Sequence, residues 1–138
     1  MKYRKVIFLI SLFPLIMCTA CSAEASAVKP DTLHVTGFIG SSRSWTISDA
    51  VQVQQIFAEE QQLPVYKPNR MFGPGPACGP RYTLNFEAGT KSLEKDELES
   101  GFCSYLIFAD GSEHQTTAAF ESHLAALLHL SVQQMRRI

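Results

Sequence analysis

The chain lacks an excess of charge of either sign. Twelve Lys and Arg side chains nearly balance thirteen Asp and Glu side chains over 138 residues, and charged residues make up only 18% of the chain. No basic stripe stands out that would neutralise a phosphate backbone, which argues against nucleic-acid binding. The 46% of hydrophobic residues is enough for one ordinary globular domain, and two domains are too many for this length.

The sequence also lacks the short motifs of common enzymes. It contains no Gly-x-Ser-x-Gly nucleophile elbow, no His-Glu-x-x-His metal helix and no paired Cys-x-x-Cys ligands. His123 and His129 are six residues apart, a spacing that does not place both on one helical face to hold a metal. The segment 64–80 is interrupted by five prolines, so it lacks the row of amides that cradles a phosphate. We therefore expect no enzymatic activity, no metal and no cofactor.

No hydrophobic run is long enough to make a comfortable membrane span. The apolar run at 6–17 has about 12 residues, whereas a membrane helix needs about 20. Lys2, Arg4 and Lys5 precede this run, and a positive start before a short apolar core is typical of a secretory signal. We expect residues 1–20 to be a signal peptide that is removed on export.

The end of this leader carries a more specific pattern. The stretch Leu15-Ile16-Met17-Cys18-Thr19-Ala20-Cys21 resembles the lipobox of bacterial lipoprotein precursors. The resemblance implies lipidation of Cys21, which follows two small residues; Cys18, which follows Met17, is the alternative. Because Ser22 rather than Asp follows Cys21, the resemblance also implies an outer-membrane lipoprotein that faces the periplasm and is attached to the membrane through its N-terminal lipid.

Two thiols remain in the mature chain if Cys21 is lipidated. An exported protein meets an oxidising compartment, so we expect Cys78 and Cys103 to form one disulfide. A closed loop of about 25 residues would stabilise the fold by roughly 3.5 kcal/mol in the chain-entropy model. A cysteine nucleophile activated by a histidine is the weaker interpretation, because neither cysteine lies in a hydrolase signature.

Residues 21–32 are small and polar, and we expect a flexible tether there, followed by a single domain at 33–138. Without the leader, nine basic and thirteen acidic side chains remain, a net charge of −4. This moderate acidity favours solubility but identifies no partner.

The domain shows patterns of both strands and helices. Leu33 and Val35 mark a first strand that ends before the glycine and serines at 40–42. Ser48 is placed to cap a helix that ends before Pro64. Alternation from Tyr82 to Glu87 indicates a strand with one buried face.

The second half of the domain is predicted in the same way. The charged stretch 89–101 is predicted to be a solvated loop or turn, and the apolar run 102–109 a central strand. Asp110-Gly111 indicates a tight turn into a short edge strand at 112–116. Thr116 or Thr117 can cap a last helix that continues to Arg136 and Arg137. Together these elements predict an α+β domain, with an antiparallel sheet of three or four strands and two helices on one face.

Two kinds of functional residue stand out. Stiff loops that expose aromatic or methionine side chains bind partners at little entropic cost, which makes Trp45, Tyr66, Met71 and Phe72 candidate partner-binding residues. The leading hypothesis is a lipoprotein that binds one other envelope protein, as an inhibitor or immunity protein or as an accessory factor of an envelope assembly or secretion system. The alternative is a small-molecule-binding or weakly catalytic domain, with Arg70 and Arg81 as pocket groups.

Overall fold

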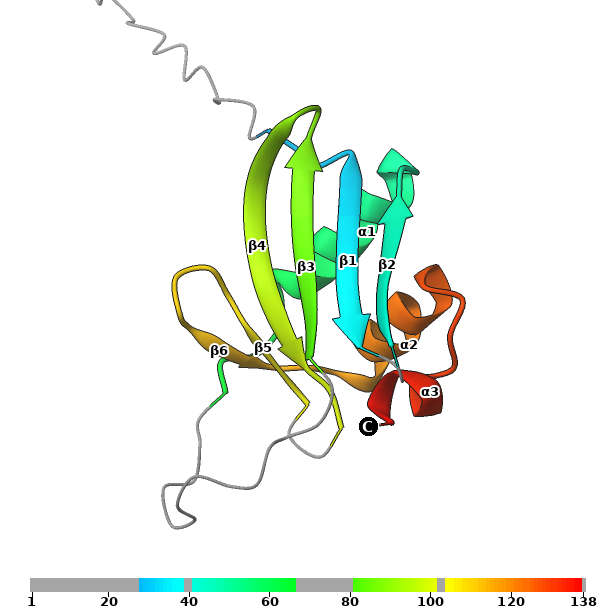
Figure 1. Cartoon of the computed structure of the whole chain (residues 1–138). Coiled ribbons are helices and arrows are strands. Elements are labelled where there is room, and N and C mark those ends of the chain that lie inside the picture. Colours follow the sequence, from blue (N-terminus) through cyan, green and yellow to red (C-terminus); the bar gives the residue numbers. More distant parts are fainter. Residues whose placement is uncertain (1–27, 39–40, 67–80, 102–103, 138) are drawn as a thin grey trace, which may run out of the picture.

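The computed structural model describes residues 28–38, 41–66, 81–101 and 104–137. Figure 1 shows one α+β domain over these ranges. In chain order, its elements are β1 (Thr32–Phe38), β2 (Ser42–Ile47), α1 (Ala50–Glu60), β3 (Arg81–Ala88), β4 (Lys91–Glu99), β5 (Tyr105–Ile107), β6 (Glu113–Gln115), α2 (Ala118–Leu127) and α3 (Val132–Arg136).

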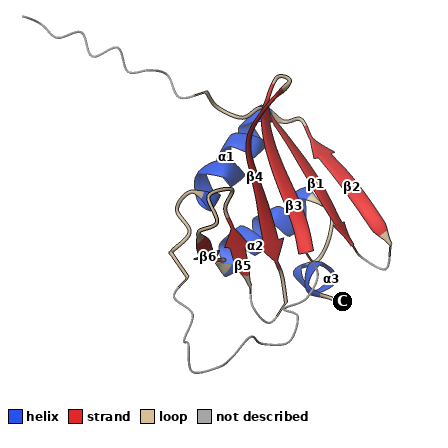
Figure 2. Ribbon diagram, turned by 60° about the vertical axis from the view of Figure 1, so that its left-hand side comes forward, coloured by secondary structure: helices blue, strands red, loops and turns tan. Residues whose placement is uncertain are grey.

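The strands form one antiparallel sheet in the order β2-β1-β3-β4-β5-β6. Both α1 and α2 lie on the same face of this sheet (Figures 1 and 2). No described helix covers the opposite face, which we call the uncovered face. A sheet with one packed and one solvated face explains the alternation of apolar and polar side chains along β3.

The core fills the space between the sheet and the two helices. Tyr82, Leu84 and Phe86 alternate along β3 and are fully buried, because each points toward the helices. Helix α1 contributes Val53 and Ile56 to the same layer. The wider core cluster also includes Leu33, Val35, Leu98, Leu106, Phe120, Leu124 and Met135. Burial of this apolar surface is the main favourable term in folding.

The last helical segment is broken into two helices. His129 has a φ of +54°, which α2 does not accommodate, and Ser131 then starts α3 with a capping box completed by Gln134. The carbonyl of Met135 accepts hydrogen bonds from the hydroxyls of Tyr82 (3.0 Å) and Ser100 (2.8 Å). These two bonds and the burial of Met135 hold α3 against the start of β3 and the end of β4.

The sequence prediction underestimated the sheet. The described residues form six strands, whereas three or four were predicted. The prediction fell short because it missed β2 and assigned the stretch 89–101 to a loop. That stretch is mostly β4, which pairs with β3 on one side and β5 on the other. Charged side chains on the uncovered face obscure its strand character in the sequence.

Other boundaries also differ. The strand predicted within 102–109 is confirmed, but β5 spans only Tyr105–Ile107 of the described residues. The described helices number three, not two. Asp49, not Ser48, caps α1, with its carboxylate accepting from the amides of Val51 and Gln52. The first strand, the Asp110-Gly111 turn into an edge strand, and the cap at Thr117 are confirmed.

Candidate functional site

A chain of side-chain contacts lies on the uncovered face, where β3 begins and β4 ends. The rings of Tyr66 and Tyr105 stack with centroids 5.6 Å apart and planes 9° from parallel. The hydroxyl of Tyr105 donates to Oε2 of Glu99 at 2.9 Å, and Oε1 of Glu99 contacts Nη2 of Arg81 at 2.6 Å. We call Tyr66, Arg81, Glu99 and Tyr105 the tyrosine–arginine cluster.

The sheet itself sets the positions of the two tyrosines. Leu106 points into the core, so its neighbour Tyr105 points to the uncovered face. Val65 forms an isolated antiparallel bridge with His114, and the amide of Tyr66 donates to the carbonyl of Glu113 at 2.7 Å. These bonds fix the backbone of Tyr66 beside β6 and bring its ring onto that of Tyr105.

The two members of the Arg81–Glu99 ion pair differ in their exposure to solvent. Glu99 is buried, with only 4% of its side chain exposed, whereas 69% of the Arg81 side chain remains exposed. Burial and the adjacent Glu99 carboxylate raise the pKa of Tyr105 to about 12, so the phenol stays protonated and donates. The cluster therefore presents aromatic surface and an exposed guanidinium edge. These groups suit recognition and include no activated nucleophile.

The sequence-predicted residues fall in different places. Tyr66 and Arg81 come together, although one was proposed for partner binding and the other for a ligand pocket. Trp45 is not part of this cluster: it pairs with Val35 on the helix side of the sheet, is half-buried, and lies 6.4 Å from the ring of Tyr82. The remaining predicted residues, Cys21, Arg70, Met71, Phe72, Cys78 and Cys103, lie outside the described residues. The disulfide thus stays a prediction.

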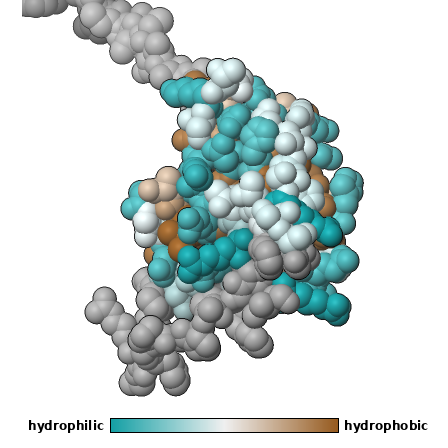
Figure 3. All heavy atoms as spheres, viewed as in Figure 1, coloured by the Kyte–Doolittle hydropathy of each residue, from teal (hydrophilic) through white to brown (hydrophobic). Residues whose placement is uncertain are grey.

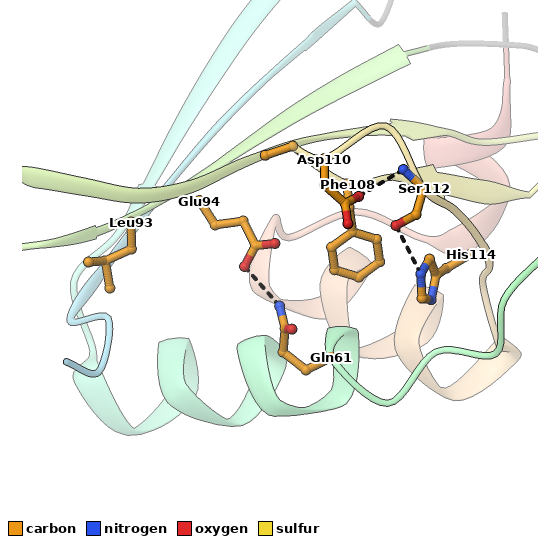
Figure 4. A pocket seen from close by; sticks show the side chains of 8 residues that line it. Gln61, Leu93, Glu94, Phe108, Asp110, Ser112 and His114 are labelled. Atoms are coloured by element: carbon orange, nitrogen blue, oxygen red, sulfur yellow. Dashed lines mark hydrogen bonds between the residues drawn. The ribbon is translucent and has the colours of Figure 1, made fainter. Parts of the chain in front are cut away.

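A second feature is a cavity between the C-terminal end of α1 and the sheet. It has a volume of about 470 Å³ and is lined by Gln61, Leu93, Glu94, Phe108, Ala109, Asp110, Ser112 and His114 (Figure 4). Gln61 donates to Glu94 at 2.8 Å, and the amide of Ser112 donates to Asp110 at 2.8 Å. Nδ1 of His114 donates to the carbonyl of Leu63 at 2.8 Å, and its Nε2 lies 3.2 Å from the Ser112 hydroxyl.

Two fully buried carboxyl groups, Glu60 and Asp96, lie beside the acidic wall of this cavity. Asp96 accepts from the amide of Ala109 at 2.8 Å through one oxygen. Within the described part of the chain, its other oxygen and both oxygens of Glu60 have no hydrogen-bond partner. Burial, and then the negative charge of Asp96 and Glu94, raise the pKa of Glu60 well above its ordinary value. Burial and the charge of Glu94 raise the pKa of Asp96 to about 7, although the Ala109 amide opposes this rise.

Sequence reasoning missed this acidic group of side chains. Glu60 follows Ile56 by one helical turn, so its place on the apolar face of the helix was a signal that could have been read. Asp96 gave no comparable signal, because its segment was predicted to be a loop.

The two histidines predicted to be at or near the surface line one cavity of about 370 Å³, together with Asp49. The break after α2 brings His129 there, while His123 is held by Glu59 through Nδ1 at 3.1 Å. Within the described ranges, no group of three or more His, Cys, Asp or Glu side chains is arranged to hold a metal ion. Nor does any helix of those ranges have the length and apolarity to cross a membrane.

The chain matches no protein-family model, no curated protein and no solved structure. Its function is therefore argued from its own residues.

Proposed function

We propose that this protein is a lipid-anchored periplasmic lipoprotein that binds another envelope protein through the tyrosine–arginine cluster. The observation that carries this proposal is the stack of Tyr66 on Tyr105, with Arg81 two contacts away. Tyrosine and arginine are enriched at the centres of protein interfaces, where they supply much of the binding energy.

The cluster is preorganised for binding. The Tyr66 backbone is bonded to β6, and the phenol of Tyr105 is bonded to Glu99. Side chains already held in place lose less rotamer entropy when a partner binds, so more of the contact energy appears as affinity. Two further candidate residues, Met71 and Phe72, belong to the segment 67–80 that joins Tyr66 to Arg81 in the sequence.

The rest of the uncovered face supplies a polar surround for such a contact. In Figure 3 this face is mainly white and teal, the colours of residues of intermediate hydropathy and of hydrophilic residues. His34 lies 3.0 Å from the hydroxyl of Thr46 and 3.5 Å from Glu87, and Asn85 donates to Glu87 at 2.6 Å. A polar surround with a few aromatic anchors is the usual composition of an interface that forms between proteins stable on their own.

The lipobox-like leader supports a location at the outer membrane. Lipidation at Cys21 would attach the domain to the outer membrane and leave it facing the periplasm, close to envelope enzymes and assemblies. An inhibitor or immunity protein and an accessory factor would use the same surface, and the identity of the partner distinguishes these two roles.

The test is crosslinking in cells, followed by purification of the lipidated protein and mass spectrometry of what it captures. We expect one dominant partner with the wild-type chain. Tyr66→Ala should reduce its yield at least about tenfold, because truncation of an interface anchor costs about 2 kcal/mol. Val65→Ala is the matched control, since this neighbouring side chain is 61% exposed and does not belong to the cluster.

Cys21→Ser serves as the mislocalised control and should lose the partner if anchoring is required. Retention of the partner by Tyr66→Ala would refute the role of the cluster. Absence of any reproducible partner would refute the protein-binding function and favour the small-molecule alternative.

A further inference from the structure

We propose that the outer side of α1, together with residues 28–30, docks on the lipid bilayer to which the chain is anchored. We call Val28, Lys29, Val51, Gln54 and Ala58 the α1 surface. The inference rests on the proposed function, because it requires the lipid on Cys21. It goes beyond that function by assigning a second contact surface and an orientation of the domain relative to the membrane.

An apolar groove forms part of this surface. It lies between residues 28–30 and α1 and has a volume of about 310 Å³. Val28, Pro30, Phe57 and Ala58 contribute to its walls, and Lys29 is the only charged residue of the lining. Apolar walls with one basic side chain at the edge match a phospholipid, whose acyl chains are apolar and whose phosphate is negative.

The outward side of α1 continues the same chemistry. Val53 and Ile56 face the core, so the opposite side of the helix presents the residues one and two turns apart at positions 51, 54, 55 and 58. The side chains of Val28 and Val51 are 63% and 76% exposed. The sequence from 50 to 58 contains no Lys, Arg, Asp or Glu, although the solvent face of a helix usually carries charges. No charge of this helical stretch therefore has to leave water when the surface meets lipid.

The distance to the anchor indicates what covers the surface. Val28 follows Cys21 by seven residues, which span at most about 25 Å when fully extended. A lipid on Cys21 therefore keeps the bilayer within reach of the groove at a high effective concentration, so even a weak apolar contact is populated. A protein that diffuses freely has no such advantage at this surface.

Docking through the α1 surface also orients the domain. Helix α1 covers one face of the sheet, whereas the tyrosine–arginine cluster lies on the uncovered face (Figure 2). With α1 against the bilayer, the sheet lies between the membrane and the cluster. The cluster then faces the periplasm, where it is open to a partner, and the two contacts do not compete.

The test is photocrosslinking to lipid with the full lipidated chain in vesicles. The vesicles consist of phosphatidylethanolamine and phosphatidylglycerol, with a small fraction of phosphatidylethanolamine that carries a diazirine in one acyl chain. After irradiation and proteolysis, mass spectrometry locates the peptides that carry a lipid adduct. We expect adducts in the peptides that contain 28–30 and 51–58, and none in the peptides of β4.

Val51→Asp is the informative variant. Position 51 lies in the first turn of α1, after the cap at Asp49, where the helix dipole favours a negative side chain, so the variant should fold. Its charge would oppose contact with lipid, and we expect at least about fivefold fewer adducts at 51–58. Val65→Asp is the matched control, because Val65 is 61% exposed but lies beside β6, outside the α1 surface. This control should be labelled as the wild type is.

Adducts confined to the N-terminal lipidated peptide would overturn the docking proposal, and so would equal labelling of the wild type and the Val51→Asp variant. A mature chain that carries no lipid on Cys21 would also overturn it, because docking requires the anchor.

Partner capture in cells separates docking from partner binding. Val51→Asp should still capture the partner, and Tyr66→Ala should still be labelled by lipid at 51–58. Loss of the partner in the Val51→Asp variant would contradict the proposed orientation. Lipid adducts at the α1 surface without any captured partner would support docking and refute only the protein-binding function.

Discussion

The buried carboxyl group of Asp96 should make this protein less stable as the pH rises from acidic to neutral. The pKa of this group rises from its ordinary value of 3.8 to about 7 in the folded state, chiefly because the side chain is buried. Between these two pH values the folded chain retains a proton that the unfolded chain has released. The unfolding free energy therefore falls through this window and levels off above pH 7.

The size of the effect follows from the same numbers. Each pKa unit corresponds to about 1.4 kcal/mol, so a rise from 3.8 to about 7 lowers the unfolding free energy by about 4 kcal/mol at pH 8. Glu60, whose pKa is also raised by burial, acts in the same direction. A loss of this size is a large part of the 5–15 kcal/mol that typically stabilises a domain.

The variant Asp96→Asn removes the titration and keeps the shape. Its side-chain oxygen can still accept from the amide of Ala109, as Asp96 does at 2.8 Å. We expect the Asp96→Asn variant to match the wild type near pH 4 and to be more stable by about 2–4 kcal/mol at pH 8. The gain falls below about 4 kcal/mol to the extent that the folded wild type relaxes around the ionised carboxylate. Urea unfolding at intervals from pH 4 to 8 measures the difference.

Glu97→Gln is the control, because this exposed side chain lies on the same strand and faces the other way. Its stability curve should run parallel to that of the wild type. A wild-type unfolding free energy that stays constant or rises between pH 5 and 8 would refute the reasoning, and so would an Asp96→Asn curve parallel to the wild type.

Three further predictions concern packing, capping and the disulfide. Gly37→Ala should cost about 1–3 kcal/mol in urea unfolding, because the new Cβ would lie 2.3 Å from Cδ1 of the buried Tyr82 ring; a neutral result would mean that the ring moves freely. Thr117→Ala should lower the unfolding free energy by about 1 kcal/mol, since the Thr117 hydroxyl accepts from an amide in the first turn of α2, whereas Thr117→Ser should retain most of the stability. Cys78→Ser and Cys103→Ser should destabilise equally, by up to roughly 3.5 kcal/mol, with no further loss in the double variant; additive losses would show that the two thiols are not bonded.

Several features could be predicted because their signals are local. Apolar side chains at every second position of 82–86 identify β3, since a half-buried strand has a period of two. Thr117 ahead of an apolar helical face identifies the start of α2, and Asp110-Gly111 identifies the turn before β6. The lipobox resemblance is likewise a property of neighbouring residues and remains a prediction for the leader.

The tertiary structure alone decided the features that depend on distant residues. The charged segment of β4 is a strand because β3 pairs with it along its length and β5 pairs with its last three residues, which its own composition does not indicate. Glu60 and Asp96 are far apart in the sequence, and only the packing of α1 on β4 brings their charges together. Tyr66 and Tyr105 likewise meet only because each lies beside β6. Local periodicity, caps and turns can be read from the sequence, because they depend on residues within a few positions of one another. Strand order, buried charge and the candidate sites depend on non-local pairing, which only the folded chain establishes.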